Sequence, residues 1–243
     1  VAGLDMLRDP AGVRRQIGYV AQGGGTVAER KVVEELVLQA TLYGMSRHAA
    51  RRRAAEVAEQ LDLGDLLDRL TGSLSGGQRR RLDIGLGLVH TPRLLFLDEP
   101  TTGLDPESRR RTWDAIQELQ EAGRTVVLTT HYLEEAEALA DRVAIMHAGE
   151  VAVRGTLSEI VAAQPASFSA GMPVDAPPLP ALTGKPELTD GRPQVHTSDL
   201  QADLTNFLGW AAHHGIALRD LRAAPASLAD IYHAVRMQQE DSR

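Results

Sequence analysis

A short apolar run that ends in two adjacent carboxylates constrains the fold of this chain more than any other feature. The run is Leu94-Leu95-Phe96-Leu97, and Asp98-Glu99-Pro100 follows it directly. An uninterrupted apolar run of this length is typical of a parallel strand that is buried on both faces. Such a strand delivers one acid to a metal and the next to a water molecule, so the sequence predicts a magnesium-nucleotide site at its carboxyl end.

A glycine-rich segment precedes this strand. Leu74-Ser75-Gly76-Gly77-Gln78 opens a helical pattern over 77–89, and Asp98 stands 20 residues after Gln78. Small residues at a helix start leave the backbone N–H groups open to a phosphate at the positive helix end. Alone, the segment reads as a surface turn, and an isolated Asp-Glu-Pro as a solvated strand end. Their order and close spacing favour a nucleotide site instead.

These motifs resemble those of the nucleotide-binding subunits of ABC transporters. Leu74 to Gln78 matches the signature motif of that family. Asp98 and Glu99 match its Walker B pair, and Leu104-Asp105 matches its D-loop. The stretch 101–106 and the first residues of the chain further resemble drug-export ATPases of the daunorubicin-resistance type. The resemblance implies ATP and Mg²⁺ as ligands.

Two further residues match the family by their order along the chain. His131 follows the β-rich segment 125–130 and precedes a helical run over 133–140. The resemblance implies that His131 is the switch histidine, which contacts the γ-phosphate. Gln22 follows a short apolar strand over 17–21 and corresponds to the Q-loop glutamine, near the magnesium ion and the membrane partner. Taken alone, Gln22 before its glycines would read as a flexible loop.

The resemblance also implies a role for each residue. Asp98 and Gln22 would form the metal site, Glu99 would be the general base, and His131 would assist hydrolysis. The residues expected to reach the ATP of an opposite subunit are Ser75, Gly76, Gly77, Gln78 and Asp105. A homodimer, or a pair with another ATP-binding subunit, would close around two nucleotides and drive a membrane permease, which exports a drug or a lipid. The substrate would be chosen by that permease.

One motif of the family is absent from the sequence. A P-loop of the form G-x-x-x-x-G-K-[ST] should precede the others, but Gly184-Lys185 is the only Gly-Lys pair and Pro186 follows it. In related proteins a segment like 1–5 comes shortly after the P-loop helix. We therefore expect an N-terminal truncation, from a late start or a fragment. A natural loss is the alternative, and the chain would then be a non-catalytic partner that lends its signature and D-loop to a complete subunit.

Composition restricts the partners further. A net charge of -7 argues against a general nucleic-acid binder. DNA-repair ATPases share the signature and Walker B motifs, but they need a long coiled coil, for which the stretch 22–74 leaves no room. No apolar run approaches membrane-spanning length, so any membrane role must come through a partner. The resemblance implies a peripheral location at the cytoplasmic face of the membrane. The arginine runs 51–53 and 79–81 are expected on solvated helix faces, although the second could also sense phosphate.

The order of patterns predicts the fold class. Apolar stripes at helical spacing over 32–90 indicate a helical subdomain, and strands alternate with helices from 92 to 163. Alternation implies an α/β, P-loop NTPase-like ABC nucleotide-binding domain with a mostly parallel sheet over 1–163. Seven prolines over 164–193 indicate a linker. A small α+β C-terminal domain is expected over 194–243, with helices over 200–213 and 227–238 and a strand near 216–221.

Overall fold

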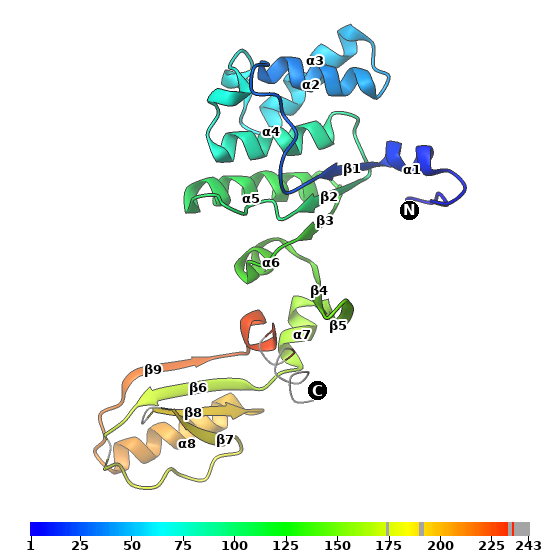
Figure 1. Cartoon of the computed structure of the whole chain (residues 1–243). Coiled ribbons are helices and arrows are strands. Elements are labelled where there is room, and N and C mark those ends of the chain that lie inside the picture. Colours follow the sequence, from blue (N-terminus) through cyan, green and yellow to red (C-terminus); the bar gives the residue numbers. More distant parts are fainter. Residues whose placement is uncertain (174, 190–191, 233–234, 236–243) are drawn as a thin grey trace. The chain divides into compact units, whose positions relative to one another are not determined.

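The computed structural model describes residues 1–173, 175–189, 192–232 and 235. Two compact units make up the described chain, Val1–Leu139 and the residues from Ala140 onward. Each unit has its own core and sheet (Figure 1).

The first unit combines a three-stranded parallel sheet with a helical region. Its strands, in the order β1-β2-β3, are β1 (Ile17–Val20), β2 (Leu94–Asp98) and β3 (Thr125–Thr129). Its α-helices are α1 (Pro10–Gln16), α2 (Val32–Leu42), α3 (Arg47–Gln60), α4 (Gly76–Leu88), α5 (Pro106–Glu121) and α6 (Leu133–Leu139). Two short 3-10 turns, η1 (Gly64–Leu66) and η2 (Thr71–Ser73), lie between α3 and α4.

Helix α4 links the helical region to the sheet. It packs on α2 and α3 on one side and on β1, β2 and α5 on the other (Figure 1). The approach to β1 is close because both elements carry glycine at the crossing, where a Cβ on Gly18 would overlap the Gly87 carbonyl. Leu82, Ile84 and Leu88 are completely buried in the same core as Leu95 and Leu97 of β2. The helix expected over 77–89 is thus confirmed, one residue earlier.

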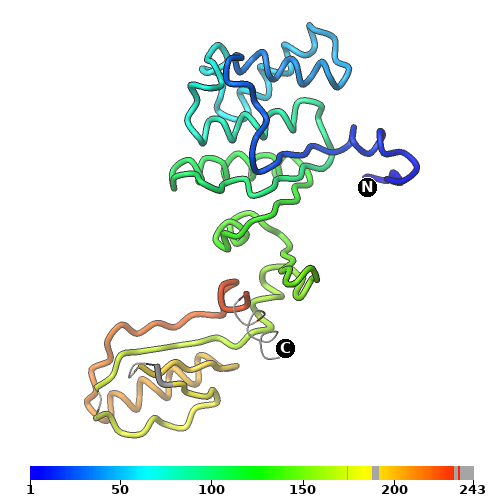
Figure 2. Tube along the Cα trace, viewed as in Figure 1, coloured from blue at the N-terminus to red at the C-terminus, as the bar shows by residue number. Residues whose placement is uncertain are grey.

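The two faces of this sheet differ in the described chain. Tyr19, Phe96 and Val127 are in register on one face, and Tyr19 is 63% exposed while Val127 is 44% exposed. Leu95 and Leu97 on the opposite face are buried against the core. β1 and β2 lie side by side although more than seventy residues separate them in the chain (Figure 2).

The second unit begins with a hairpin and a helix. β4 (Arg142–His147) and β5 (Glu150–Thr156) pair antiparallel around Ala148-Gly149, both with positive φ, as a two-residue hairpin requires. Helix α7 (Leu157–Ala162) follows, capped by Thr156 and Glu159.

A four-stranded antiparallel sheet in the order β7-β8-β6-β9 forms the rest of this unit. The strands are β6 (Ala166–Gly171), β7 (Lys185–Thr189), β8 (Arg192–Thr197) and β9 (Arg219–Ala224). Helix α8 (Leu200–His213) packs on β6, and Phe207 meets Phe168 with ring centroids 5.2 Å apart. Asp203 on α8 is buried and accepts hydrogen bonds from the N–H groups of Thr183 and Gly184.

The segment 164–193 differs from the expected linker. It supplies β6 and β7 and the first residues of β8, and β6 is a central strand of the sheet. Proline is tolerated here because Pro186 lies on the edge strand β7, and Pro193 precedes the part of β8 that pairs with β6. The helix over 200–213 is confirmed, and the strand near 216–221 is found at 219–224. Residues 228–232 are helical; the rest of the helix expected to 238 lies outside the described residues, except 235, which is also helical.

None of the helices in the described part of the chain combines the length and hydrophobicity that crossing a membrane needs. The mostly parallel sheet, the helical subdomain and the C-terminal α+β appendage agree with the predicted fold class.

Candidate functional site

The parallel sheet brings the predicted strand-end residues to one edge. β1, β2 and β3 run in the same direction, so their carboxyl ends meet there. Gln22 follows β1, Asp98 ends β2 with Glu99 directly after it, and His131 follows β3. Three segments that are distant in the sequence therefore contribute side chains to one place.

Glu99 is the centre of this group. Its Oε2 accepts hydrogen bonds from Gln22 Nε2 at 2.6 Å and from Thr102 Oγ1 at 3.0 Å. The Nδ1 of His131 lies 3.5 Å from the same oxygen. We call these four residues, Gln22, Glu99, Thr102 and His131, the Glu99 cluster. The Glu99 side chain is 30% exposed and that of His131 53% exposed, so a ligand at the strand ends can reach both.

The backbone at Glu99 is specialised. Its φ is +46°, in the left-handed region that residues with a side chain seldom adopt. Its N–H donates to the carbonyl of Thr129 at 3.1 Å, with the Thr129 hydroxyl also 3.2 Å away. Residues held in such a conformation cluster at functional sites, where the surrounding contacts fix them. Here those contacts come from β3 and from the cluster itself.

Asp98 is oriented by the same threonine. Thr129 Oγ1 donates to Asp98 Oδ1 at 2.6 Å. Thr129 thus holds both acids, and like Thr102 it was not predicted from the sequence. Hydroxyl residues at strand ends carry no distinctive pattern, and only the pairing of β2 with β3 identifies this one.

The residues fit a magnesium ion of the kind that nucleotides bring. Mg²⁺ is usually held by one or two carboxylates together with substrate phosphates and water molecules. Asp98 offers such an oxygen at the sheet edge, with Gln22 nearby through its bond to Glu99. Within the described ranges, no group of three or more His, Cys, Asp or Glu side chains could hold a metal ion.

The signature segment has a different construction. Ser75 is the N-cap of α4: its Oγ accepts from the Gln78 N–H at 3.2 Å, and the Gln78 side chain accepts from the Ser75 N–H at 3.0 Å. This reciprocal pair is a capping box. Gly76, which is exposed, and Gly77, which is buried, form the first turn. The start of a helix, with its unpaired N–H groups and the positive end of the helix dipole, favours an anion.

Asp105 lies at the start of the neighbouring helix. It is the N-cap of α5 and accepts from the Ser108 N–H at 2.9 Å. Hydrogen bonds from Ser108 lower the pKa of its carboxyl group. A Cβ on Gly77 would lie 2.6 Å from Ser108 Oγ, so only glycine lets the two helix starts approach this closely. The signature segment and Asp105 are therefore adjacent, as the resemblance implies.

A buried carboxylate on α6 connects segments that flank the Glu99 cluster. Glu135 on α6 is completely buried, and its Oε1 accepts from Thr101 Oγ1 at 2.9 Å and from Trp113 Nε1 at 3.0 Å. Its Oε2 is buried with no hydrogen-bond partner within the described chain. This contact joins the helix after His131 to the residue that follows Pro100. Apart from the helical spacing of α6, no sequence pattern predicts it.

The arginine run 79–81 does not lie on a solvated helix face as expected. Arg79 is exposed, but Arg80 and Arg81 are buried, at 7% and 4% exposure. Their guanidinium groups donate to backbone carbonyls, which offsets the cost of burial. They therefore belong to the interior of the unit and not to a solvated helix face.

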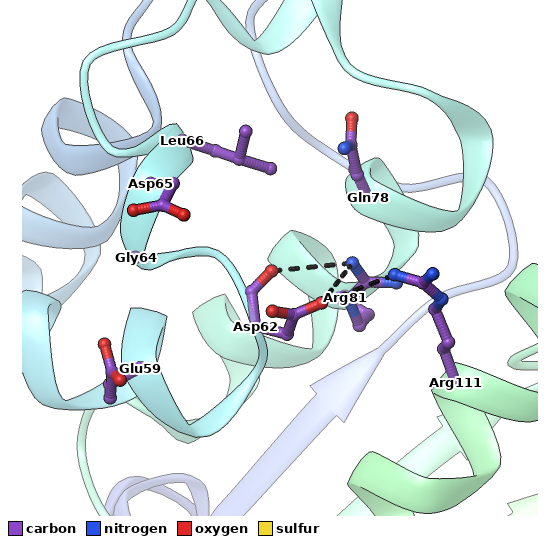
Figure 3. Close-up of a pocket in the computed structure, with 8 residues that line it drawn as sticks. All are labelled: Glu59, Asp62, Gly64, Asp65, Leu66, Gln78, Arg81 and Arg111. Atoms are coloured by element: carbon purple, nitrogen blue, oxygen red, sulfur yellow. Dashed lines mark hydrogen bonds and ion pairs between the residues drawn. The ribbon is translucent and has the colours of Figure 1, made fainter.

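A polar cavity of about 320 Å³ lies beside the signature helix, away from the strand ends (Figure 3). Asp62 lies between Arg81 and Arg111 there, at 3.5 and 3.7 Å. Gln78 belongs to its lining, but Asp98, Glu99 and His131 do not. The candidate site is therefore the Glu99 cluster, because of its chemistry, and not this cavity.

Taken together, the fold and the strand-end acids define an α/β nucleotide-binding domain of the ATPase kind. Comparison with known proteins makes this specific. Residues 3–102 match the ABC transporter family model, and residues 166–227 match the C-terminal domain of ABC transporter domain-containing protein-like chains. The chain belongs to the ABC transporter family of ATP-binding proteins.

Individual relatives agree with this. Daunorubicin/doxorubicin resistance ATP-binding protein DrrA of Streptomyces peucetius is 49% identical over 66% of this chain and 48% of its own length. Doxorubicin resistance ATP-binding protein DrrA of Mycobacterium tuberculosis is 39% identical over 95% of this chain and 70% of its own length. A solved structure described as the ATP binding subunit of an ABC transporter has a TM-score of 0.56 at 29% identity, over 66% of this chain and 67% of that one. The chain thus spans about half the length of the first relative.

Proposed function

We propose that this chain is the ATP-hydrolysing subunit of an exporter, with Asp98, Glu99, His131 and Gln22 as its hydrolytic residues. The observation that carries the proposal is the convergence of Gln22, Thr102 and His131 on one oxygen of Glu99. A carboxylate held in this way at the end of a parallel strand is placed to accept a proton from water.

Each side chain then has a definite task. Asp98, oriented by Thr129, would hold Mg²⁺, which neutralises developing charge on the phosphate oxygens when bound. Glu99 would accept the proton of the attacking water as general base. His131 and Gln22 both contact the same Glu99 oxygen and would orient that water and the γ-phosphate. In-line attack then releases phosphate.

The second half of the proposal concerns partners. The exposed residues Ser75 and Gly76 of the signature segment, with the nearby Asp105, would contact ATP bound to another copy of the chain or to a different ATP-binding subunit. Closure of the pair would be passed to a membrane permease, which binds the drug or lipid substrate at the membrane. The names of the relatives, which refer to daunorubicin and doxorubicin resistance, support export as the direction.

Substitution of Glu99 tests the hydrolytic assignment. In the protein isolated from its own cells with its associated subunits, Glu99→Gln should lower ATP turnover by roughly 100-fold or more, because general bases contribute about 10²–10⁴-fold. ATP affinity should be kept. Glu134→Gln, an exposed acid on α6, is the matched control and should turn over normally. Normal turnover in the Glu99 variant would refute Glu99 as the base.

A second function is favoured by a specific observation. The signature segment is fully formed, with a capping box between Ser75 and Gln78. The chain would then lend signature and D-loop to the ATP held by a complete subunit. Calorimetric titration separates the two functions: ATP binding by the purified chain alone supports the hydrolytic one. Absence of binding, together with Ser75-dependent stimulation of a complete subunit, supports the second.

A further inference from the structure

Helix α4 carries a buried arginine that contacts every strand-end segment except that of His131. Arg80 donates from NH1 to the Ala21 carbonyl at 2.6 Å, from NH2 to the Asp98 carbonyl at 2.8 Å and from Nε to the Pro100 carbonyl at 2.9 Å. These carbonyls immediately precede Gln22 and flank Glu99. One guanidinium thus holds both partners of the Gln22–Glu99 hydrogen bond by their main chains.

A buried acid one turn later holds the other side of the Gln22 loop. Asp83 is 8% exposed, and the Gly25 N–H donates a hydrogen bond to its carboxylate. Gly24 lies against the same carboxylate and has a φ of +66°. A Cβ at this position would lie only 2.9 Å from Asp83 Oδ2, which is too close. Burial raises the pKa of Asp83, and the charge of Arg80 opposes that shift. Arg80 and Asp83 therefore hold the loop on both sides of Gln22, through the Ala21 carbonyl and the Gly25 N–H.

We propose that Arg80, supported by Asp83, is a positioning residue that ties the signature helix to the Gln22–Glu99 contact. Its guanidinium is a rigid planar fork, so three carbonyls bound to it keep fixed relative positions. Since α4 begins at the signature segment, a displacement of that segment moves Arg80 and with it the two strand ends. When the signature segment contacts ATP bound to a second subunit, its displacement in this way changes the position of Glu99. The catalytic meaning of this link rests on the proposed function, whereas the mechanical link does not.

Arg81 provides a matched control. It is the next residue on α4, is at least as deeply buried, and also donates to backbone carbonyls, those of Leu61 and Asp62. Burial lowers the pKa of both guanidinium groups. Arg81 points toward Asp62 and the polar cavity, where it meets no strand-end residue (Figure 3). A purely stabilising role would make the two arginines equivalent.

Amide hydrogen exchange of Arg80→Met and Arg81→Met decides between these roles without any nucleotide. In the Arg80 variant, the amides of Gly24, Glu99 and Thr102 should exchange roughly tenfold faster or more, because their loops open locally. In the Arg81 variant the faster exchange should be confined to residues near 61–66. Equal acceleration in both variants, or unchanged exchange at Glu99 in the Arg80 variant, overturns the proposal.

Two further measurements complete the test. If Arg80→Met fails to fold, Asp83→Asn is the second variant, because it preserves the side-chain volume. It should accelerate amide exchange at Gly24 and Gly25 only. In the ATP-hydrolysing preparation, Arg80→Met should lower kcat roughly tenfold with KM nearly unchanged, whereas Arg81→Met should leave kcat nearly unchanged. If the unsubstituted protein hydrolyses no ATP, the proposed function fails, and the exchange result alone still decides the role of Arg80.

Discussion

The Glu99 cluster and the signature segment are held in different ways. Around Glu99, hydrogen bonds join residues 77, 31 and 30 positions apart, as in Gln22–Glu99, Thr129–Asp98 and Thr129–Glu99. At Ser75–Gln78, the side-chain bonds span only three positions, and the contact with α5 depends on a missing side chain at Gly77. The first region depends on the sheet, and the second is largely encoded in its own turn.

This difference has a functional consequence. A cluster that the sheet assembles loses its geometry when distant supports are changed, while a locally capped helix start keeps its shape unless its own residues change. Under the proposed function, the locally encoded region is the one that meets another subunit. We therefore expect the geometry around Glu99 to change most when residues distant in the sequence are substituted. The geometry of the signature segment should change most when its own residues are substituted.

The largest expected effect comes from Glu135, a remote support of the Glu99 segment. Glu135→Ala leaves the hydroxyl of Thr101 and the indole N–H of Trp113 without their acceptor. Each unsatisfied buried donor costs about 1–3 kcal/mol, so the free energy of unfolding should fall by about 3 kcal/mol. Urea denaturation followed by circular dichroism measures this. Glu134→Ala, on the exposed side of the same helix, should stay within about 0.5 kcal/mol, and equal losses would contradict a remote support.

The next effect belongs to the signature segment and tests the close approach of α4 and α5. A methyl group on Gly77 would overlap Ser108, so Gly77→Ala should cost about 1–3 kcal/mol by overpacking. Gly76→Ala would meet only Leu104 Cδ2 at 3.6 Å and should be neutral or slightly stabilising. Thermal unfolding of the two variants gives the comparison. Tolerance of both alanines would mean that the helix starts are not in contact.

How far the sequence predicts this molecule follows from the same difference. The strand β2 and the start of α4 come from local patterns, and they are found where expected, within one residue. Thr129 is found only through its tertiary contact with Asp98, and Thr102 only through its bond to Glu99 three positions away. A threonine has no sequence pattern that distinguishes a site residue from a surface one. The strand-end residues could be named, but not the atom on which they meet.

Two errors have a common physical cause. Proline density over 164–193 indicates broken structure, but an edge strand has unpaired N–H positions that proline can occupy without loss. Arginine runs indicate a solvated face, but main-chain carbonyls satisfy the guanidinium groups of Arg80 and Arg81 in the interior. In both cases a tertiary partner reverses a local preference, and sequence patterns do not show partners.

A smaller effect is expected from the cap itself. Ser75→Ala removes the acceptor for the Gln78 N–H, and loss of such a cap costs typically about 1 kcal/mol. Ser46→Ala is the matched variant, since Ser46 caps α3 and does not belong to the proposed site. Both should lower the unfolding midpoint to a similar extent, but only Ser75→Ala should lower ATP turnover in the associated complex. Equal turnover losses would mean that the signature acts through stability alone.

The smallest expected effect is a pH dependence at the far end of α4, remote from both regions. His90 stacks on Tyr43 with ring centroids 3.7 Å apart, and its Nε2 lies 2.9 Å from the Ile17 carbonyl. Burial lowers the pKa of His90 below its ordinary value of 6.5, so the unfolded chain binds more protons just below pH 6.5. This stability contribution is complete above pH 6.5 and is lost as the pH falls through the folded pKa.

The stability advantage of the unsubstituted protein over His90→Gln should therefore shrink between pH 7.5 and about pH 5.5. Urea denaturation at a series of pH values measures the difference. His48→Gln, at an exposed position on α3, is the control for loss of a histidine outside this contact. If the two curves for His90 run parallel, the imidazole is not buried as a neutral group. The contact between α4 and β1 would then be looser at this end than at Arg80, where the helix holds the strand ends.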